Sequence, residues 1–203
     1  MTARLVVMIS GGGSNLQAIL DACGRAEGES GRLDAEVVAV ISNKADAYGL
    51  ERARLAGIDA IHVPVDGRSR AIYDGVLSHV VRDAKPDLVV LGGWMRLLSN
   101  GFLKRFQVVN IHPALPGAYA GLHAIERSFA AWEAGEITES GAMVHWVPDE
   151  GVDDGPVIAQ RVVPFEDGDS LASFEARLHA AEHSLYVEAL ASIIPDLETA
   201  GTP

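Results

Sequence analysis

The sequence has 203 residues, a formal net charge of −12 and a hydrophobic content of 48%. This length suits one α/β domain with a sizeable core, and the negative charge argues against binding to nucleic acid or to an anionic membrane. The single cysteine, Cys23, excludes an intrachain disulfide. No apolar run reaches membrane-spanning length and no signal peptide is recognised, so we expect a cytoplasmic protein.

A run of three glycines follows the first predicted strand. Residues 5–9 are apolar throughout, as in a strand covered on both faces, and residues 10–17 read Ser-Gly-Gly-Gly-Ser-Asn-Leu-Gln. Ser14 and Gln17 match a capping box, which predicts a helix start. Glycines beside a helix N-terminus favour an anion site, so we predict phosphate binding here, with a capped helix that binds no ligand as the alternative. Leu16 stands where the dinucleotide fingerprint needs its third glycine.

Strands and helices alternate through the first half of the chain, which predicts a doubly wound, mainly parallel sheet of the Rossmann-like type. The helix expected within residues 68–84 carries Arg70 near its start, where a cation opposes the helix dipole. Such a local conflict is often functional, although a solvated surface arginine is the plainer interpretation. Its apolar spacing predicts an inward face, made of Ile72, Val76, Leu77 and Val80. The flanking strands are predicted at residues 36–41, 60–63 and 87–91, and a short helix at 48–56.

A bulky apolar segment follows the Gly92-Gly93 pair at the end of the strand 87–91. Residues 94–98 could line a pocket for a flat ring, since methionine adapts to such rings, and Arg96 could bind a carboxylate through two hydrogen bonds. Core packing is the alternative for Leu97 and Leu98.

Asn110 and His112 are the strongest candidates for a reaction centre. Both lie at the end of a predicted strand, residues 107–111, and Pro113 favours extended backbone at His112. Residues two apart in an extended chain point to the same side, and ligands bind at the carboxyl ends of strands in open α/β sheets. The alternative is an asparagine that caps a loop beside a surface histidine.

The last part of the chain predicts two strands that pair across an acidic loop, and then a long C-terminal helix. The strands are expected at residues 141–147 and 157–163, the helix at 170–194, and a further helix near 121–134. Four carboxylates between residues 148 and 156 suggest a solvated turn or a metal site, but the ligand spacing of calcium loops is missing, so we predict no metal. One of these carboxylates reaching back to His112 is the functional option.

Several motifs in the sequence resemble the folate-dependent formyltransferase superfamily, and the similarity covers nearly the whole chain. Asn-x-His-Pro at residues 110–113, with the downstream Asp153-Asp-Gly-Pro, is specific to that superfamily. The segments 9–17 (ISGGGSNLQ) and 42–53 (SNKADAYGLERA) point to its glycinamide ribonucleotide branch. Further shared segments are MRLLS (95–99), GLH (121–123), VHWV (144–147), DDGPVI (153–158) and Glu182-His183.

The resemblance implies one domain over residues 1–203, with a ribonucleotide phosphate-binding half (1–100) and a folate and catalytic half (101–203). The implied catalytic residues are Asn110, His112 and Asp153, supported by His123 and His145. The implied ribonucleotide-binding residues are Gly12, Gly13, Ser14, Asn15, His179 and Glu182. The implied folate-binding residues are Arg70, Met95, Arg96, Leu97, Leu98, Asn110, Val147, Pro148, Asp149 and Asp153, with Arg70 and Arg96 meeting the glutamate carboxylates of the folate.

The implied reaction is formyl transfer from 10-formyltetrahydrofolate to the amine of glycinamide ribonucleotide, in de novo purine synthesis. It needs no metal, and the expected partners are these two substrates, with no nucleic acid or membrane, for a monomer or homodimer. Asn110 and a cationic His112 would donate to the oxyanion. Asp153 would raise the pKa of His112, keep it charged and assist proton transfer.

The sequence departs from the family pattern at three places. Residues 114–117 read Ala-Leu-Pro-Gly after the His-Pro pair, and His179 stands where other members often have Lys or Gln. The segment 145–153 is one residue longer, which leaves Asp153 and Asp154 as candidates for the acid, with the Asp-x-Gly-Pro spacing favouring Asp153.

Three rival interpretations remain. Methionyl-tRNA formyltransferases carry an extra RNA-binding domain and a basic surface, and formyltetrahydrofolate hydrolases carry an extra N-terminal domain; we expect neither extra domain in this acidic chain. The third is a non-catalytic nucleotide- or folate-binding module on the same fold.

Overall fold

The computed structural model describes residues 2–23 and 33–200. Within them, seven strands form one sheet in the order β3-β2-β1-β4-β5-β6-β7. The strands are β1 (Ala3–Ile9), β2 (Ala35–Ser42), β3 (Asp59–His62), β4 (Leu88–Leu91), β5 (Val108–His112), β6 (Glu139–Trp146) and β7 (Val157–Pro164). The helices are α1 (Ser14–Cys23), α2 (Tyr48–Leu55), α3 (Arg70–Asp83), α4 (Asn100–Leu103), α5 (Ala124–Glu133) and α6 (Leu171–Ala200).

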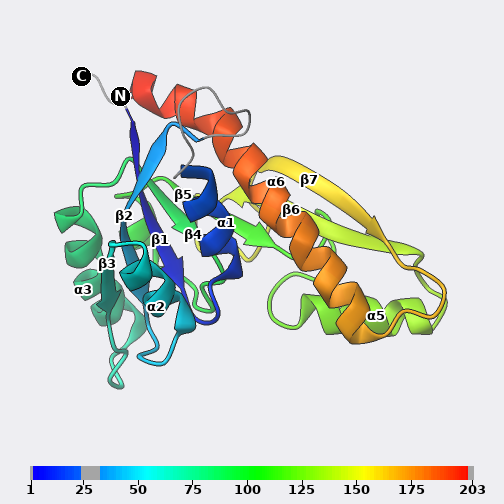
Figure 1. Ribbon diagram of the computed structural model, residues 1–203. Coiled ribbons are helices and arrows are strands. Elements are labelled where there is room, and N and C mark those ends of the chain that lie inside the picture. The colour runs from blue at the N-terminus through cyan, green and yellow to red at the C-terminus, as the bar shows by residue number, and fades with distance from the viewer. Residues whose placement is uncertain (1, 24–32, 201–203) are drawn as a thin grey trace.

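The first five strands are parallel, while β6 runs antiparallel to β5 and β7 antiparallel to β6. This arrangement confirms the predicted mainly parallel sheet, the antiparallel C-terminal pair and the long C-terminal helix. Figure 1 shows α6 passing along β6 and β7 and ending near the N-terminus of β1. No helix in the described part of the chain is long and apolar enough to cross a membrane.

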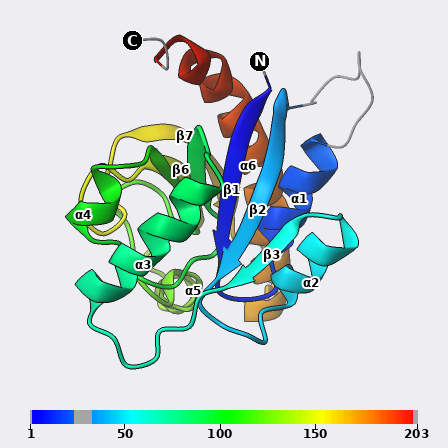
Figure 2. The same cartoon turned by 90° about the vertical axis from the view of Figure 1, so that its left-hand side faces the viewer.

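Strand β1 is buried on both faces because its side chains pack alternately into two separate hydrophobic cores. Leu5, Val7 and Ile9 pack with residues of α1, α2, α5 and α6, whereas Val6 and Met8 pack with residues of α3 and α4. Figure 2 shows α3 and α4 on one side of the sheet and α1, α2 and α6 on the other. A continuous apolar run is therefore what this position requires.

The sheet order reverses between β1 and β4, which lie side by side although they are far apart in sequence. The chain leaves β1 toward β2 and β3 and returns through α3 to β4, so the connections diverge at the carboxyl ends of β1 and β4. In open α/β sheets such a switch point forms the ligand-binding crevice.

The predicted inward face of α3 was only partly correct. Leu77 is fully buried and Val80 packs against the same core, whereas Ile72 is 61% exposed and Val76 is also exposed. Tyr73 and Val81, which the prediction left out, are fully buried. The hydroxyl of Tyr73 donates to the carbonyl of Val63 at 3.0 Å. This bond and the bulk of the ring fix the rotation of the helix about its axis. The spacing of apolar residues in the sequence reports neither of them.

Candidate functional site

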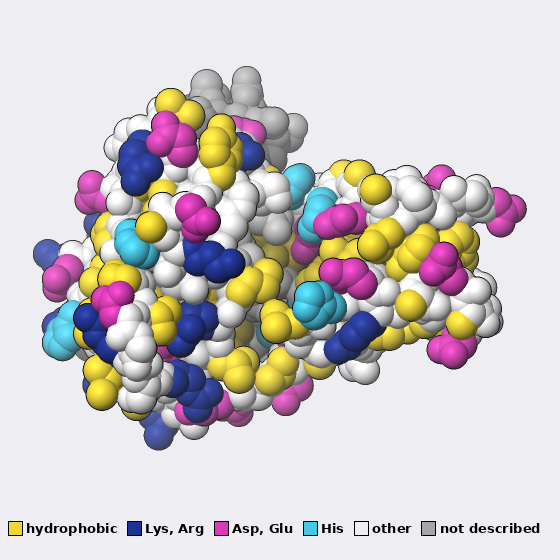
Figure 3. Space-filling view, turned by 90° about the horizontal axis from the view of Figure 1, so that it is seen from below, with side chains coloured by type: hydrophobic (Ala, Val, Ile, Leu, Met, Phe, Trp, Pro, Cys, Tyr) yellow, Lys and Arg dark blue, Asp and Glu magenta, His cyan; other side chains and the backbone are white. Residues whose placement is uncertain are grey.

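A cavity of about 760 Å³ opens at the carboxyl ends of β1, β4 and β5. Its walls come from the loops after these strands, from the loop between β6 and β7, and from one face of α6. In Figure 3 histidine, acidic and hydrophobic side chains gather around the hollow between the wider and the narrower part of the molecule. The volume suits a drug-sized ligand or two smaller ones.

Three predicted catalytic side chains meet at one end of this cavity. The Nδ1 atom of His112 lies 3.2 Å from Oδ2 of Asp153, and the Nδ2 atom of Asn110 lies 3.1 Å from Oδ1 of the same carboxylate. The backbone amide of Gly121 donates to Oδ2 at 2.8 Å. All three side chains line the cavity, whereas Asp154 is not part of its wall. Of the two candidate acids, Asp153 is therefore the one that contacts His112.

The local backbone explains how these residues meet. Asn110 and His112 lie two apart on β5 and share one side of the strand. Asp153 has a left-handed backbone with φ of 53°, a conformation that aspartate tolerates better than most residues. A Cβ atom on Gly155 would overlap the carbonyl of Trp146, so only glycine lets the loop return to the sheet there.

Burial sets the charge of His112. Its side chain is buried, and this burial lowers the pKa of His112; the attraction of Asp153 and the contact of Nε2 with the Tyr119 carbonyl only partly offset the effect. Asp153 thus acts in the predicted direction, but the prediction that it keeps His112 charged was wrong, because desolvation is the larger effect.

Asp153 itself is ionised at neutral pH. Burial alone would raise its pKa, but the neighbouring His145 ring, the hydrogen bond from the Gly121 amide and the neighbouring His112 ring together lower the pKa of Asp153 below its usual value. The buried end of the cavity therefore holds a carboxylate beside an imidazole.

His145 fixes the orientation of the Asn110 amide across the antiparallel pair. The two residues are partners in the β5–β6 register, and Nδ2 of Asn110 lies 3.2 Å from Nε2 of His145. The Nδ1 atom of His145 faces the carbonyl of Trp146 at 2.9 Å, so Nδ1 donates and Nε2 accepts. Both amide hydrogens of Asn110 are thus directed at Asp153 and His145.

The glycine loop after β1 forms another part of the wall, made by residues 11–15. Gly13 has φ of 69°, and a Cβ atom there would lie 2.8 Å from the Cα atom of Gly49, so α2 packs directly on the loop. The amide of Gly49 donates to the carbonyl of Gly11 at 3.1 Å, and Nε of Arg52 donates to the carbonyl of Gly12 at 2.9 Å. Residues of α2 thus hold the loop on the side away from the cavity, and the N-terminus of α1 faces the cavity.

The helix α1 begins at Ser14 as predicted, but the backbone amide of Gln17 donates to the carbonyl of Gly13 at 3.0 Å and the predicted capping box does not form. The side chain of Gln17 instead donates to Asp21 at 2.9 Å and accepts a bond from Arg52 at 2.9 Å. The Gln17 side chain therefore does not cap the backbone N–H groups of the first turn of α1, and these groups can bind an external anion.

His179 and Glu182 face the same cavity from α6, together with Glu175. Nδ1 of His179 lies 2.5 Å from Oε2 of Glu182, and Nε2 lies 3.4 Å from Oε1 of Glu175. The hydrogen bond to Glu182 raises the pKa of His179, with further help from Glu175, although burial opposes it. This end of the cavity thus places an imidazole with a raised pKa between two carboxylates.

The predicted folate segment lines the cavity at residues 95–98, and its side chains divide by role. Met95 is 59% exposed and Leu97 is also exposed, whereas Leu98 is 4% exposed and belongs to the core beneath α3 and α4. The guanidinium of Arg96 lies 5.0 Å from the ring centre of Tyr73, and its buried Nε atom has no hydrogen-bond partner among the described residues. Arg96 also belongs to the cavity wall, which places its guanidinium beside any ligand bound there.

The remaining predicted residues lie at different distances from the cavity. Val147 and Asp149 belong to its wall, and Pro148 and Arg70 do not. Arg70 forms an ion pair with Glu150, which also accepts a bond from the amide of Asn100 at 2.8 Å. His123 lines the cavity mouth, with its side chain 73% exposed and 3.2 Å from Glu126.

Sequence reasoning missed four residues that build this site: Gly49, Arg52, Glu150 and Glu175. Glu150 belongs to the cavity wall and lies in the acidic loop already singled out, and Trp94, from the predicted segment 94–98, also lines the wall. Glu175 lies one helical turn before His179, so helical spacing alone could have indicated it. Gly49 and Arg52 act through the glycine loop, a contact that no local pattern predicts.

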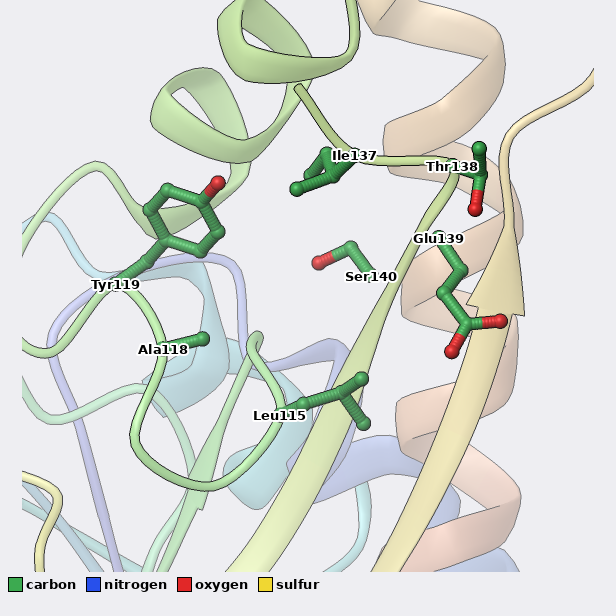
Figure 4. A pocket seen from close by; sticks show the side chains of 7 residues that line it. All are labelled: Leu115, Ala118, Tyr119, Ile137, Thr138, Glu139 and Ser140. Atoms are coloured by element: carbon green, nitrogen blue, oxygen red, sulfur yellow. The ribbon is translucent and has the colours of Figure 1, made fainter. Parts of the chain in front are cut away.

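A second hollow of about 570 Å³ lies beside Tyr119 and the start of β6. Figure 4 shows its lining, which includes Leu115, Ile137 and Ser140. None of the predicted site residues contributes to it, so the sequence-predicted chemistry belongs to the larger cavity alone.

Comparison with known proteins agrees with this geometry. Residues 3–190 match the family model described as formyl transferase. The chain is 46% identical to a phosphoribosylglycinamide formyltransferase of Schizosaccharomyces pombe, over 97% of this chain and 99% of that protein. It is 47% identical to the enzyme of that name from Escherichia coli, over 90% of this chain and 83% of that protein.

A solved structure shows the same fold. The crystal structure of glycinamide ribonucleotide transformylase 1 from Symbiobacterium toebii superimposes with a TM-score of 0.85 at 43% identity, covering 94% of this chain and 86% of the other. With the family model spanning most of its length and relatives of this similarity, the chain belongs to the formyl transferase family.

Proposed function

We propose that the protein is a phosphoribosylglycinamide formyltransferase, which transfers the formyl group of 10-formyltetrahydrofolate to the amine of glycinamide ribonucleotide in purine biosynthesis. The observation that carries the proposal is the joining of two sites in one cavity. An anion-binding glycine loop lines one part of it, and Asn110, His112 and Asp153 line another. A substrate with a phosphate at one end and an amine at the other fits that arrangement.

The phosphate of the ribonucleotide would lie against residues 12–15. The backbone amides at the N-terminus of α1 and the positive end of its dipole favour a dianion there. His179 lies on the same cavity wall between Glu175 and Glu182, so this cluster adds no net positive charge, and Glu182 can accept hydrogen bonds from ribose hydroxyls. The helix N-terminus supplies a local positive potential for the anion in a chain of net charge −12.

The folate would occupy the part of the cavity between residues 95–98 and the loop 147–153. Exposed Met95 and Leu97 offer apolar contact to its rings. The guanidinium of Arg96, which belongs to the cavity wall, is suited to a glutamate carboxylate. Arg70 would join it only if the carboxylate replaced Glu150 in the ion pair.

The chemical step would begin with attack of the substrate amine on the formyl carbon. A C–N bond forms, the formyl oxygen becomes an oxyanion, and the bond from carbon to N10 of the folate then breaks as N10 takes up a proton. Asn110 would donate an amide hydrogen to the oxyanion in place of one of its present acceptors, a contribution of about 3–4 kcal/mol for a well-placed donor.

His112 and Asp153 would move the proton. A neutral His112 whose Nδ1–H points at Asp153 leaves Nε2 able to accept the proton of the attacking amine once the substrate replaces the Tyr119 carbonyl, which lies 3.2 Å from Nε2. The ionised Asp153 stabilises the imidazolium that results, and this cation can return the proton to N10. The lowered pKa of His112 thus suits a base in the free protein better than a permanent cation.

In this proposal residues 1–203 act as one unit, with residues 1–100 contributing the phosphate loop and 101–203 the catalytic residues. We expect the enzyme to work in the cytoplasm, as a monomer or homodimer. The test is incubation with glycinamide ribonucleotide and 10-formyltetrahydrofolate while deformylated folate is followed. Product that appears without the ribonucleotide would identify a hydrolase, and no product under either condition would identify a binding module.

A further inference from the structure

The second hollow, of about 570 Å³, lies where β6 extends past the end of β5. The two strands pair over residues 143–146 of β6, and the part of β6 before Met143 pairs with β7 alone. The loop after β5 covers the open side: a Cβ atom on Gly141 would lie 2.7 Å from Cδ2 of Leu115, so the loop packs directly on the strand there. Beside this contact the loop and the strand separate, and the hollow lies between them.

One buried polar group in the second hollow lacks a partner. Ser140 is 3% exposed, and its Oγ atom forms no hydrogen bond within residues 2–23 and 33–200. Figure 4 shows this hydroxyl pointing into the hollow, between Tyr119 and Ile137. Burying a hydroxyl without a partner is unfavourable, so a ligand that supplies the partner is stabilised at this position.

The rest of the lining defines the chemistry of an occupant. Four of the side chains are apolar or aromatic: Leu115, Ala118, Tyr119 and Ile137. Among the described residues, Glu139 is the only charged residue of the lining, and in Figure 4 its exposed side chain is directed away from Tyr119. A charge buried without a counter-charge is costly, which favours an uncharged molecule with an apolar body. The Ser140 hydroxyl both donates and accepts, and so suits a hydroxyl group on that molecule.

Tyr119 connects the second hollow to the catalytic residues. Its side chain lines the hollow, while its carbonyl oxygen lies 3.2 Å from Nε2 of His112. In the proposed reaction this nitrogen accepts the amine proton after the substrate has replaced the carbonyl. The carbonyl cannot leave His112 without moving the backbone that carries the tyrosine ring. An occupant packed against the ring therefore opposes that step.

We propose that the second hollow is an effector site for a small uncharged molecule with an apolar body and one hydroxyl group, and that its occupant inhibits formyl transfer by holding the Tyr119 carbonyl against His112. The inhibition rests on the proposed function, whereas the binding does not depend on it.

Binding is tested with benzyl alcohol on the full-length protein without substrates. Toluene is the matched molecule that lacks the hydroxyl, and benzoate and benzylamine are its charged counterparts. In NMR spectra of the backbone amides, benzyl alcohol should shift the signals of residues 114–120 and 137–141, and the charged molecules should leave them in place. Ser140→Ala should weaken benzyl alcohol binding about 2–10-fold, the usual contribution of one hydrogen bond, and leave toluene binding unchanged.

A pair of variants on the loop after β5 locates the site. Ala118→Trp fills the second hollow and should abolish binding of both benzyl alcohol and toluene. Ala120→Trp adds the same bulk at an exposed position outside the lining and should bind both as the wild type does. Equal binding by Ala118→Trp and the wild type, shifts confined to residues 11–15 and 95–98, or no binding at all would overturn the site. Tighter binding of benzoate or benzylamine would overturn the proposed class of ligand.

Turnover tests the link through Tyr119. With both substrates saturating, saturating benzyl alcohol should lower kcat of the wild type about 2–10-fold, the effect of one retained hydrogen bond. The inhibition constant should equal the dissociation constant and rise by the same factor in Ser140→Ala. Full turnover by the occupied enzyme would overturn the link. A wild type that transfers no formyl group even without benzyl alcohol would disprove the proposed function instead, while the NMR result stands, so the two failures are distinguishable.

Discussion

The Nδ1 atom of His112 lies 3.2 Å from Oδ2 of Asp153. The imidazole at the end of β5 is therefore oriented by a carboxylate from the loop between β6 and β7. The loop is kept in place by the bond from the Gly121 amide to Asp153 and by the left-handed backbone of Asp153 itself. Positive φ values also occur at Tyr119 and His123, which belong to the segment facing this loop. Backbone conformations of this kind cost energy and are concentrated where function requires a fixed geometry.

Replacing Asp153 with Asn should abolish most of the turnover and leave substrate binding nearly unchanged. The neutral amide cannot stabilise an imidazolium at His112, so we expect kcat to fall by about 10²–10⁴-fold. Single-turnover kinetics report the chemical step, and calorimetry reports the dissociation constants of both substrates. Asp154→Asn, which removes a neighbouring carboxylate outside the cavity wall, is the matched control and should keep wild-type kinetics. Normal turnover by Asp153→Asn would exclude the proposed role.

The elements of the sheet were predictable because each apolar run had few interpretations. Residues 5–9, 87–91 and 107–111 were expected as strands and lie within or beside β1, β4 and β5. The face of α3 was not predictable, because the buried position of Tyr73 depends on its bond to Val63 and not on helical spacing alone.

Most residues of the site were predictable, together with the contact of Asp153 with His112, but the other contacts among them were not. Alternation along β5 places Asn110 and His112 on one side, whereas the contact of Asn110 with His145 follows from the register of β5 with β6. The charge of His112 depends on how deeply it is buried, and the ion pair of Arg70 depends on where a loop 80 residues later comes to lie. The burial of His112 and the ion pair of Arg70 are set by contacts between distant parts of the folded chain, which no local sequence pattern encodes.

Gly49→Ala should destabilise the protein and weaken ribonucleotide binding together. A Cβ atom at this position would overlap the side chain of Ile9 and press on Gly13, so we expect a loss of about 1–3 kcal/mol in the free energy of unfolding. Urea denaturation and calorimetry measure the two effects. Gly75→Ala in α3 is the control: its Cβ atom meets nothing within 4 Å, and alanine favours a helix interior by up to about 1 kcal/mol. Equal stability changes for the two variants would contradict the packing of α2 on the loop.

Arg96→Met should weaken folate binding selectively. The variant keeps much of the side-chain bulk over Tyr73 but removes the donors, and a hydrogen bond to a charged group contributes about 1.5–3 kcal/mol, or roughly 10–150-fold in affinity. We expect the KM for 10-formyltetrahydrofolate to rise while the dissociation constant of the ribonucleotide stays constant. Arg54→Met, which removes an exposed arginine paired with Glu51 on α2, should change neither value. An unchanged folate KM in Arg96→Met would assign the carboxylate contact elsewhere.

The stability of the protein should fall more steeply between pH 7.5 and 5.5 in the wild type than in His112→Gln. Because burial lowers the pKa of His112 in the folded state, the unfolded chain binds the proton first as pH falls through 6.5. This contribution to stability is complete above the unfolded pKa and is lost progressively below it, by up to about 1.4 kcal/mol per pH unit. His183, whose pKa is also lowered, contributes in the same direction to both proteins, so the difference between their slopes isolates His112. Urea unfolding at several pH values gives these slopes, and parallel slopes would mean that His112 binds its proton equally well in the folded and unfolded states.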